Sequence, residues 1–293
     1  MTMREAYEAH IARQDREKTS RYGVHYYEQE KNFVEPFHLY GPVWYVGDSW
    51  VCVHLIDTGD GLLLIDSGNC GATAMLILSI QKAGFDPADV KWIIHSHGHM
   101  DHFGGANFFK RLFGTKLYLG APDAKMFREK PWLTLVQTTC DDMDRIFEPD
   151  VEIRDGDVLT FGNIQIKCVL CPGHTDGVVS LFFEADGEEG VKRFGYYGGF
   201  GFNTLEKPYL LEIGDPEFKM RKVYLASLAK VRGEKVEIML GNHTENNKTL
   251  EKRQRQLEHP DAPNPFVDPE CWGKYLDGKR DALLEFMAKP ENN

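Results

Sequence analysis

Five histidines and one aspartate have the residue types and the spacing of a metal site. Four of these residues lie close together in His97-Gly98-His99-Met100-Asp101-His102, and the other two are His174 and His243. Neutral imidazoles with one carboxylate are ligands that suit zinc or a similar divalent metal. The ligands are numerous enough for two ions, and paired ions activate water for attack. The pattern therefore predicts a metal-dependent hydrolase.

Each of the three places lies directly after a predicted strand. The apolar stretches that predict these strands are residues 90–94, 164–170 and 236–240. Loops at the ends of strands are where α/β scaffolds display their chemistry. We therefore expect three strand ends to converge on one cleft.

The spacing within residues 97–102 divides the four candidate ligands into two pairs. His97 and His99 are two residues apart, and such residues face the same way in an extended backbone, so both would reach one ion. Asp101 and His102 follow where the chain turns, which would direct them at a second ion. The remaining histidines are interpreted as structural residues: His10, His25, His38, His54, His95 and His259.

The rest of the chain predicts the scaffold for these loops. Strands are predicted at residues 38–40, 43–46, 51–56, 62–65, 116–119, 178–183 and 192–197. Helices are predicted at residues 71–83, 104–113, 122–128, 216–232 and 246–258. Strands followed by helices, twice, predict an α/β fold with two sheets between helical layers. We expect one domain over residues 1–293, with an N-terminal helix over about 3–18 and a C-terminal helical extension over about 260–293.

Charge and hydropathy exclude several kinds of partner. The net charge is −11, from 34 basic and 45 acidic residues, and it argues against binding to nucleic acid. No stretch resembles a signal peptide or a membrane span, so we predict no membrane partner and a cytoplasmic location.

The cysteines are predicted to be mostly free thiols in that reducing compartment. They are Cys52, Cys70, Cys140, Cys168, Cys171 and Cys271. Cys168 and Cys171 form a C-x-x-C, but Cys168 lies within an apolar run and the chain has no second C-x-x-C. We interpret this pair as small residues near a core strand.

Residues 37–243 resemble the metallo-beta-lactamase superfamily. The most specific match is the His-x-His-x-Asp-His motif at residues 97–102. Further matches, in the family's order, are Leu64-Ile65-Asp66-Ser67-Gly68, Gly104-Gly105, Pro172-Gly173-His174-Thr175 and His243. The resemblance implies an αββα four-layer sandwich.

The resemblance also implies a role for each candidate ligand. One Zn²⁺ would be bound by His97, His99 and His174, and a second Zn²⁺ by Asp101, His102 and His243. A hydroxide would bridge the two ions and attack a carbonyl group, and Asp101 would act as the catalytic residue that orients it. Asp66 would be buried behind the ligands and hold their loop in place.

One departure from the family points to a subgroup. Most hydrolytic members have a bridging Asp on a strand between His174 and His243, whereas the equivalent residues 194–200 contain no acid and no cysteine. The remaining ligand set is similar to that of the third subclass of metallo-beta-lactamases. Residues 43–47 and 155–159 also look closest to that subclass.

Two glycines separate the chain from those lactamases. Gly199 and Gly201 stand where lactamases of the third subclass usually have serines that help to hold the drug's carboxylate. This difference, with the lack of an export signal, argues against antibiotic hydrolysis. A beta-lactamase of the third subclass is kept as an alternative.

Formal charge favours an anionic substrate. Two divalent ions, Asp101 and a bridging hydroxide leave about +2. We therefore predict a small lactam, amide, lactone or thioester that bears a carboxylate. The substrate-binding residues are unknown, and specificity is expected to lie in residues 125–150 and 199–215.

Two further hypotheses and one structural question stay open. Some relatives hold one iron with two His and one Asp and are oxidoreductases, but His102 and His243 complete a second site here. A metal-binding protein without catalysis is a third hypothesis, although no ligand of the set is missing. Residues 260–293 would either cap the site or form a homodimer, and the pattern favours neither.

Overall fold

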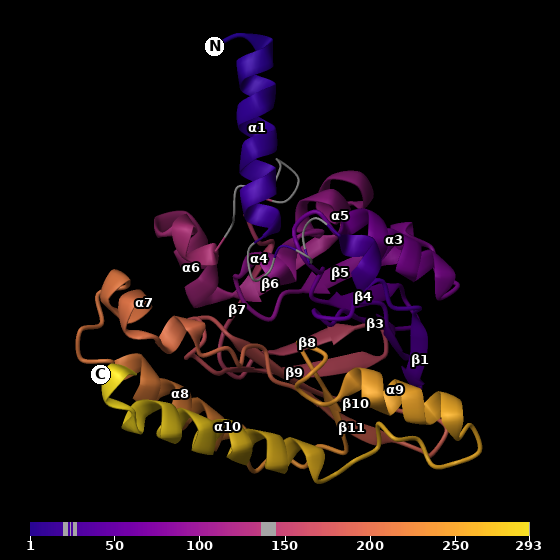
Figure 1. Ribbon diagram of the computed structural model, residues 1–293. Coiled ribbons are helices and arrows are strands. Elements are labelled where there is room, and N and C mark those ends of the chain that lie inside the picture. Colours follow the sequence, from indigo (N-terminus) through magenta and orange to yellow (C-terminus); the bar gives the residue numbers. More distant parts are fainter. Residues whose placement is uncertain (20–22, 24, 26–27, 136–144, 293) are drawn as a thin grey trace.

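Two β-sheets lie face to face, and helices cover the outer face of each sheet (Figure 1). This computed structural model describes residues 1–19, 23, 25, 28–135 and 145–292. Helices, sheet, sheet and helices form the four layers of an αββα sandwich, so the predicted α/β fold is confirmed.

The first sheet joins seven strands of the described residues in chain order. They are β1 (Phe37–Tyr40), β2 (Val43–Tyr45), β3 (His54–Asp57), β4 (Leu62–Ile65), β5 (Val90–Ile94), β6 (Lys116–Gly120) and β7 (Val151–Ile153). Strands β1 to β4 pair antiparallel, and β4 to β7 pair in parallel. The outer face carries α3 (Thr73–Lys82), α4 (Met100–Phe103), α5 (Ala106–Phe113) and α6 (Ala121–Glu129). Every residue of β4 is buried, as expected for a strand that is apolar on both faces.

The second sheet joins five strands of the described residues in the order β12-β11-β10-β9-β8. They are β8 (Val158–Phe161), β9 (Ile164–Leu170), β10 (Val179–Ala185), β11 (Lys192–Tyr196) and β12 (Ile238–Leu240). Only β11 and β12 pair in parallel. The helices on this side are α7 (Lys207–Glu212), α8 (Lys219–Val231), α9 (Thr249–Glu258) and α10 (Cys271–Ala288).

Apolar side chains form a buried cluster in each interface between layers. Ile65 and Leu181 meet between the two sheets, Ile80 of α3 packs on the first sheet, and Leu276 of α10 packs on the second. Burial of one such side chain stabilises the fold by about 1.5–3 kcal/mol. The clusters therefore hold the strands, and the loops at their ends, in fixed positions.

The two terminal helices differ in how they pack. α1 (Met3–Lys18) matches the predicted N-terminal helix and projects away from the sandwich (Figure 1). α10 lies within the predicted C-terminal extension and packs against α8 and β12. The short 3-10 helices are η1 (Gln29–Asn32), η2 (Pro87–Asp89), η3 (Pro131–Thr134), η4 (Asn203–Leu205) and η5 (Pro290–Asn292). In the part of the chain that the structure describes, no helix has both the length and the apolar character to cross a membrane.

Residues 51–53 depart from the strand predicted over 51–56. β3 begins only at His54, because the residues before it pair with another segment. Val51 forms an isolated antiparallel bridge with His243, and the Cys52 N–H donates to the Asn242 carbonyl at 2.9 Å. The apolar pattern alone did not distinguish these two pairings.

α5 begins two residues later than the helix predicted over 104–113. Gly104 packs directly on Asn69, and a Cβ on this glycine would lie 2.0 Å from the Asn69 carbonyl oxygen. The Gly104 N–H donates to the Gly68 carbonyl at 2.8 Å. This contact fastens the chain before the helix begins. Residues 136–144, which include Cys140 and part of the expected specificity segment 125–150, lie outside the described residues.

Candidate metal centre

The fold brings all six candidate ligands together. They follow β5 (His97 and His99), lie in α4 (Asp101 and His102), or follow β9 (His174) and β12 (His243). The ends of three strands thus converge, as the positions of the apolar stretches predicted.

His97, His99 and His174 form the first donor group. Their donor atoms all lie within 4.8 Å of one another. Nδ1 of His99 and Nε2 of His174 are 2.9 Å apart, and the His97 ring centroid is 4.7 Å and 4.8 Å from those of His99 and His174. All three residues are buried. Three imidazoles therefore face one small volume.

Asp101, His102 and His243 form the second donor group. Oδ2 of Asp101 lies 3.4 Å from Nε2 of His102 and 3.6 Å from Nε2 of His243. The His102 ring centroid is 4.2 Å from that of His97 and 5.2 Å from that of His243. The second group is therefore adjacent to the first.

Hydrogen bonds behind the rings orient two of the ligands. Nδ1 of His174 is 2.9 Å from the Gly201 carbonyl oxygen, so it donates and its Nε2 is free to face the first group. Nδ1 of His102 donates to Oδ2 of Asp66 at 2.8 Å, which directs its Nε2 toward the second group. Such partners fix the tautomer of a metal-binding histidine.

Asp66 is fully buried at the centre of a hydrogen-bond network. Besides His102, it accepts from the Ser96 N–H at 2.7 Å, the Ser96 hydroxyl at 2.9 Å and the Tyr196 hydroxyl at 2.5 Å. Burial opposes its charge, but His102 holds the pKa of Asp66 below its ordinary value. Its φ of 63° is left-handed, which costs a non-glycine residue about 1–2 kcal/mol. The surrounding hydrogen bonds offset this cost.

Asp123 supports the first donor group, although the sequence did not indicate it. Its buried carboxylate accepts from the Gly98 N–H at 2.7 Å, the Thr175 hydroxyl at 2.7 Å and the Gly177 N–H at 2.8 Å. It therefore ties the loop after β5 to the loop after β9. Burial raises the pKa of Asp123 to about 6.

The first donor group is neutral at pH 7. Burial lowers the pKa of His174 to about 4, and it holds the pKa values of His97 and His99 well below the ordinary range. Neutral imidazole is the form that binds a metal ion.

The second donor group carries charge. Burial opposes a charge on His102, but the carboxylates of Asp101 and Asp66 outweigh burial and raise the pKa of His102 to about 10. Burial also opposes the charge on Asp101, whose pKa is nevertheless held well below its ordinary value by His102 and His243. Burial lowers the pKa of His243 to about 4.

Both donor groups fit zinc. Nε2 of His97 and Nε2 of His102 are buried and have no hydrogen-bond partner among the described residues. An unsatisfied buried polar atom costs about 1–3 kcal/mol, which coordination to an ion would remove. Three imidazoles in one group, and two imidazoles with a carboxylate in the other, are donor sets typical of zinc.

Main-chain pairing and an aromatic stack hold the loop of His243. The Thr244 N–H donates to the Trp50 carbonyl at 3.0 Å, and the Trp50 ring lies 5.3 Å from the His243 ring. His25 stacks on Trp50 at 4.1 Å. His54 lies outside both donor groups, and its Nε2 is 2.9 Å from the Gly241 carbonyl oxygen.

Comparisons with known proteins find a matching family model and similar solved structures. The family model described as the metallo-beta-lactamase superfamily matches residues 51–187. A subclass B3 metallo-beta-lactamase of Bradyrhizobium japonicum aligns with a TM-score of 0.77 and 27% identity, over 88% of this chain and 97% of that chain. Residues 51–187 thus match the metallo-beta-lactamase superfamily, and the chain has the fold of this lactamase. The predicted similarity to the third subclass of its lactamases is confirmed.

Curated relatives match over shorter stretches. An uncharacterized protein of Aquifex aeolicus is 33% identical over 118 residues, which cover 39% of this chain and 51% of that protein. A hydroxyacylglutathione hydrolase of Anaeromyxobacter dehalogenans is 28% identical over 131 residues, or 45% of this chain and 41% of that protein. The chain spans about half or less of the length of these relatives.

Gly199 and Gly201 pack against the His174 ring. A Cβ on Gly199 would lie 2.9 Å from Cδ2 of His174. A Cβ on Gly201 would lie 2.7 Å from Cε1 of His174 and 2.6 Å from Oδ1 of Asn203. A serine at either position therefore requires the ring or the loop to move.

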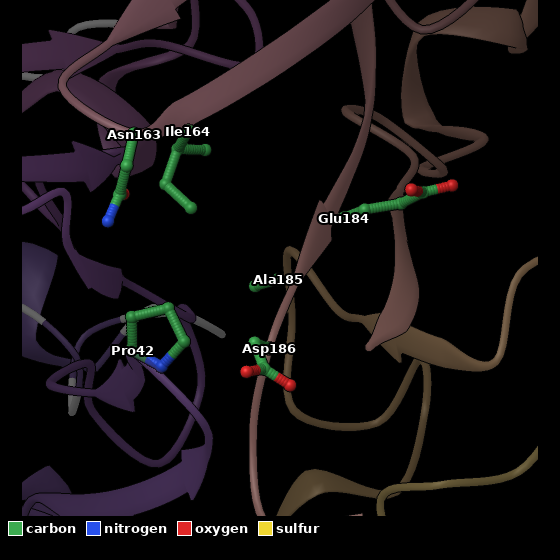
Figure 2. Close-up of a pocket in the computed structure, with 6 residues that line it drawn as sticks. All are labelled: Pro42, Asn163, Ile164, Glu184, Ala185 and Asp186. Atoms are coloured by element: carbon green, nitrogen blue, oxygen red, sulfur yellow. The ribbon is translucent and has the colours of Figure 1, made fainter. Parts of the chain in front are cut away.

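A separate pocket of about 360 Å³ lies away from the donor groups (Figure 2). Its lining residues are Pro42, Asn163, Ile164, Glu184, Ala185 and Asp186. Ile164 begins β9, whereas His174 follows the end of that strand. Its lining residues include no histidine or cysteine, so they lack the imidazole and thiolate ligands typical of a zinc site.

Proposed function

We propose that this protein is a dinuclear zinc hydrolase that cleaves a small lactam, amide, lactone or thioester bearing a carboxylate. The observation that supports it is the adjacency of the two donor groups, in which the His97 and His102 ring centroids are 4.2 Å apart and both residues have unpartnered buried Nε2 atoms. The superfamily and the hydroxyacylglutathione hydrolase relative support the coarser class, a metal-dependent hydrolase.

The bound zinc ions would supply an acidified water near pKa ~7 and polarise the carbonyl group of the substrate. The residues of the chain position the reactants. Oδ2 of Asp101 lies between His102 and His243, where it can accept a hydrogen bond from a water molecule and orient it. Asp66 and the Gly201 carbonyl keep the ligand rings in the required orientation.

The substrate class is narrowed by the residues around His174. Serines at 199 and 201 would contact the His174 ring, and they are the residues that help lactamases of the third subclass to hold the drug's carboxylate. We therefore favour a lactone, amide or thioester over a beta-lactam antibiotic.

The iron oxidoreductase is the alternative within the same fold. A single iron needs only part of this ligand set, whereas His243 lies within 3.6 Å of Asp101 and gives the second group a third donor. This contact favours two ions. We also propose a small-molecule substrate, a cytoplasmic location and a homodimer.

Metal analysis and a hydrolysis panel test the proposal together. Protein purified without added metal should contain two zinc ions per chain, and should hydrolyse one class among nitrocefin, acyl-homoserine lactones and glutathione thioesters. A chelator should abolish the activity and zinc should restore it. The variant His243→Ala should lose one zinc, whereas His259→Ala, at an exposed position, should keep both.

Two outcomes would contradict the proposal. One iron per chain would favour the oxidoreductase. Faster cleavage of neutral esters than of their acid-bearing analogues would contradict the predicted preference for a carboxylate.

A further inference from the structure

We propose that the ammonium group of Lys279, on α10, binds the carboxylate of the substrate. This inference rests on the proposed hydrolase function and assigns a substrate-recognition residue to it. Lys279 is half-buried within the C-terminal extension, a segment whose role the sequence left open.

One face of α10 contacts the loops that support both donor groups. Tyr275 and Lys279 are four residues apart and therefore share this face. The Tyr275 hydroxyl donates to Oδ1 of Asn246 at 2.5 Å, and the Asn246 N–H donates to the His243 carbonyl at 3.1 Å. The Tyr275 ring also packs on Phe200 at 4.4 Å. The helix thus bridges the loop of His243 and the loop that holds His174.

Three aromatic rings surround the ammonium group of Lys279. Its Nζ lies 5.7 Å from the Phe200 ring centroid, 5.7 Å from that of Phe202 and 5.2 Å from that of Tyr275. Aromatic faces attract a cation at these distances but do not accept its N–H groups as an anion does.

The ammonium group is available to an anionic ligand. Among the described residues, no hydrogen bond uses Lys279 and no carboxylate lies within 4.0 Å of it. The charge of Glu245, an exposed residue, acts on it from a longer distance. Burial lowers the pKa of Lys279, so its desolvated charge gains more from an anion than an exposed lysine does.

Lys279 is also close to the first donor group. Phe200 and Phe202 flank Gly201, whose carbonyl holds His174. Burial is the main cause of the low pKa of His174, and the charge of Lys279 contributes to it. Lys279 therefore supplies a positive charge close to the first donor group. Gly199 and Gly201 lack the serine hydroxyls that could otherwise bind a carboxylate there.

A purely structural role would make Lys279 only a support for α10 on the aromatic rings. The variant Lys279→Met separates the two roles, because it keeps most of the apolar stem and removes the charge. Lys279→Arg keeps the charge. Lys274→Met removes an exposed lysine of the same helix, which pairs with Glu270 at 2.5 Å.

The test uses 3-mercaptopropionate and its methyl ester as probes of the zinc-loaded protein. Each probe has a thiol, a ligand that zinc accepts, and only one has a carboxylate. Titration calorimetry gives both dissociation constants. We expect the wild type and Lys274→Met to bind the acid at least about tenfold more tightly than the ester. Lys279→Met should lose this preference, with unchanged zinc content and melting temperature, and Lys279→Arg should retain part of it.

Two results would overturn the proposal: equal binding of acid and ester by the wild type, or an unchanged preference in Lys279→Met. Glu245→Gln provides a second measurement if Lys279→Met does not fold, because removal of this acid should strengthen the preference and a constant preference would count against Lys279. The probes require no hydrolysis. If the substrate panel fails while the preference depends on Lys279, only the proposed reaction is wrong.

Discussion

The two donor groups lie side by side, yet their surroundings differ. The first has three buried neutral imidazoles, and a main-chain carbonyl orients His174. The second has a carboxylate and a protonated imidazole, and the side chains of His243 and Asp101 are 22% and 16% exposed. We infer that the first group is preorganised for tight binding of an ion, and that the second is suited to exchange with solvent and substrate.

Replacement of a ligand in each group gives the largest expected effect. His99→Ala should lose the first ion, and Asp101→Ala the second. Each should lower kcat/KM on the order of 10³-fold, because the Lewis-acid contribution of an ion is several kcal/mol and each 1.36 kcal/mol is a factor of ten. Elemental analysis measures the zinc content of each variant, and steady-state kinetics measures its kcat/KM. Retention of two zinc ions in either variant would show that the ligand is wrongly assigned.

Asp66→Asn should lower the zinc affinity of the second donor group more than that of the first. The change removes the negative charge that His102 donates to, and loss of such a partner typically costs 10–100-fold in metal affinity. Tyr196→Phe is the matched control, since it removes one of the hydrogen bonds to Asp66 and leaves the charge. Competition with a zinc chelator measures both ions. An equal loss of zinc affinity in both groups would contradict the inferred difference between them.

Binding of the second ion should release about one more proton per chain than binding of the first ion. At pH 7 the protein without metal holds a proton on His102, whose pKa is about 10, and the second ion must displace it. The first group has no proton to release, since the pKa of His174 is about 4. Affinity for the second ion should therefore rise about tenfold per pH unit between pH 7 and pH 9, and affinity for the first should stay constant. Calorimetry in buffers of different ionisation enthalpy measures this, and equal release from both groups would contradict it.

Gly201→Ser should have the smallest effect. The new side chain meets the His174 ring, and overpacking of this kind costs about 1–3 kcal/mol. We expect a lower melting temperature and weaker binding of zinc by the first donor group. Gly278→Ser is the control, because nothing lies within 4 Å of a Cβ at Gly278. An unchanged melting temperature in Gly201→Ser would contradict this, because it would mean that the loop accommodates the serine without strain.

The sequence predicted those parts of the fold that local pattern determines. β4 and β9 begin and end at the predicted residues, because their apolar stretches are bounded by turn residues. The start of β3 was wrong, since residues 51–53 pair with the distant loop of His243.

The candidate ligands and the supporting residue Asp66 could be proposed from the sequence, but Asp123 and Lys279 could not. Residues 97–102 form a compact motif, and strand ends explain where His174 and His243 lie. Asp123 acts through hydrogen bonds to Gly98 and Thr175, which come from two other segments. The surroundings of Lys279 likewise form only when α10 packs on a distant loop, so no spacing in the sequence reveals either residue.

The pairing between the start of β3 and the loop of His243 joins two segments that are synthesised far apart in time. His54 and Gly241, joined by one of these contacts, are 187 residues apart in the chain. Proteins are synthesised from the N-terminus, so a ribosome releases all three histidines of the first group well before it releases His243. The second donor group therefore cannot be complete until synthesis has passed β12 and reached His243.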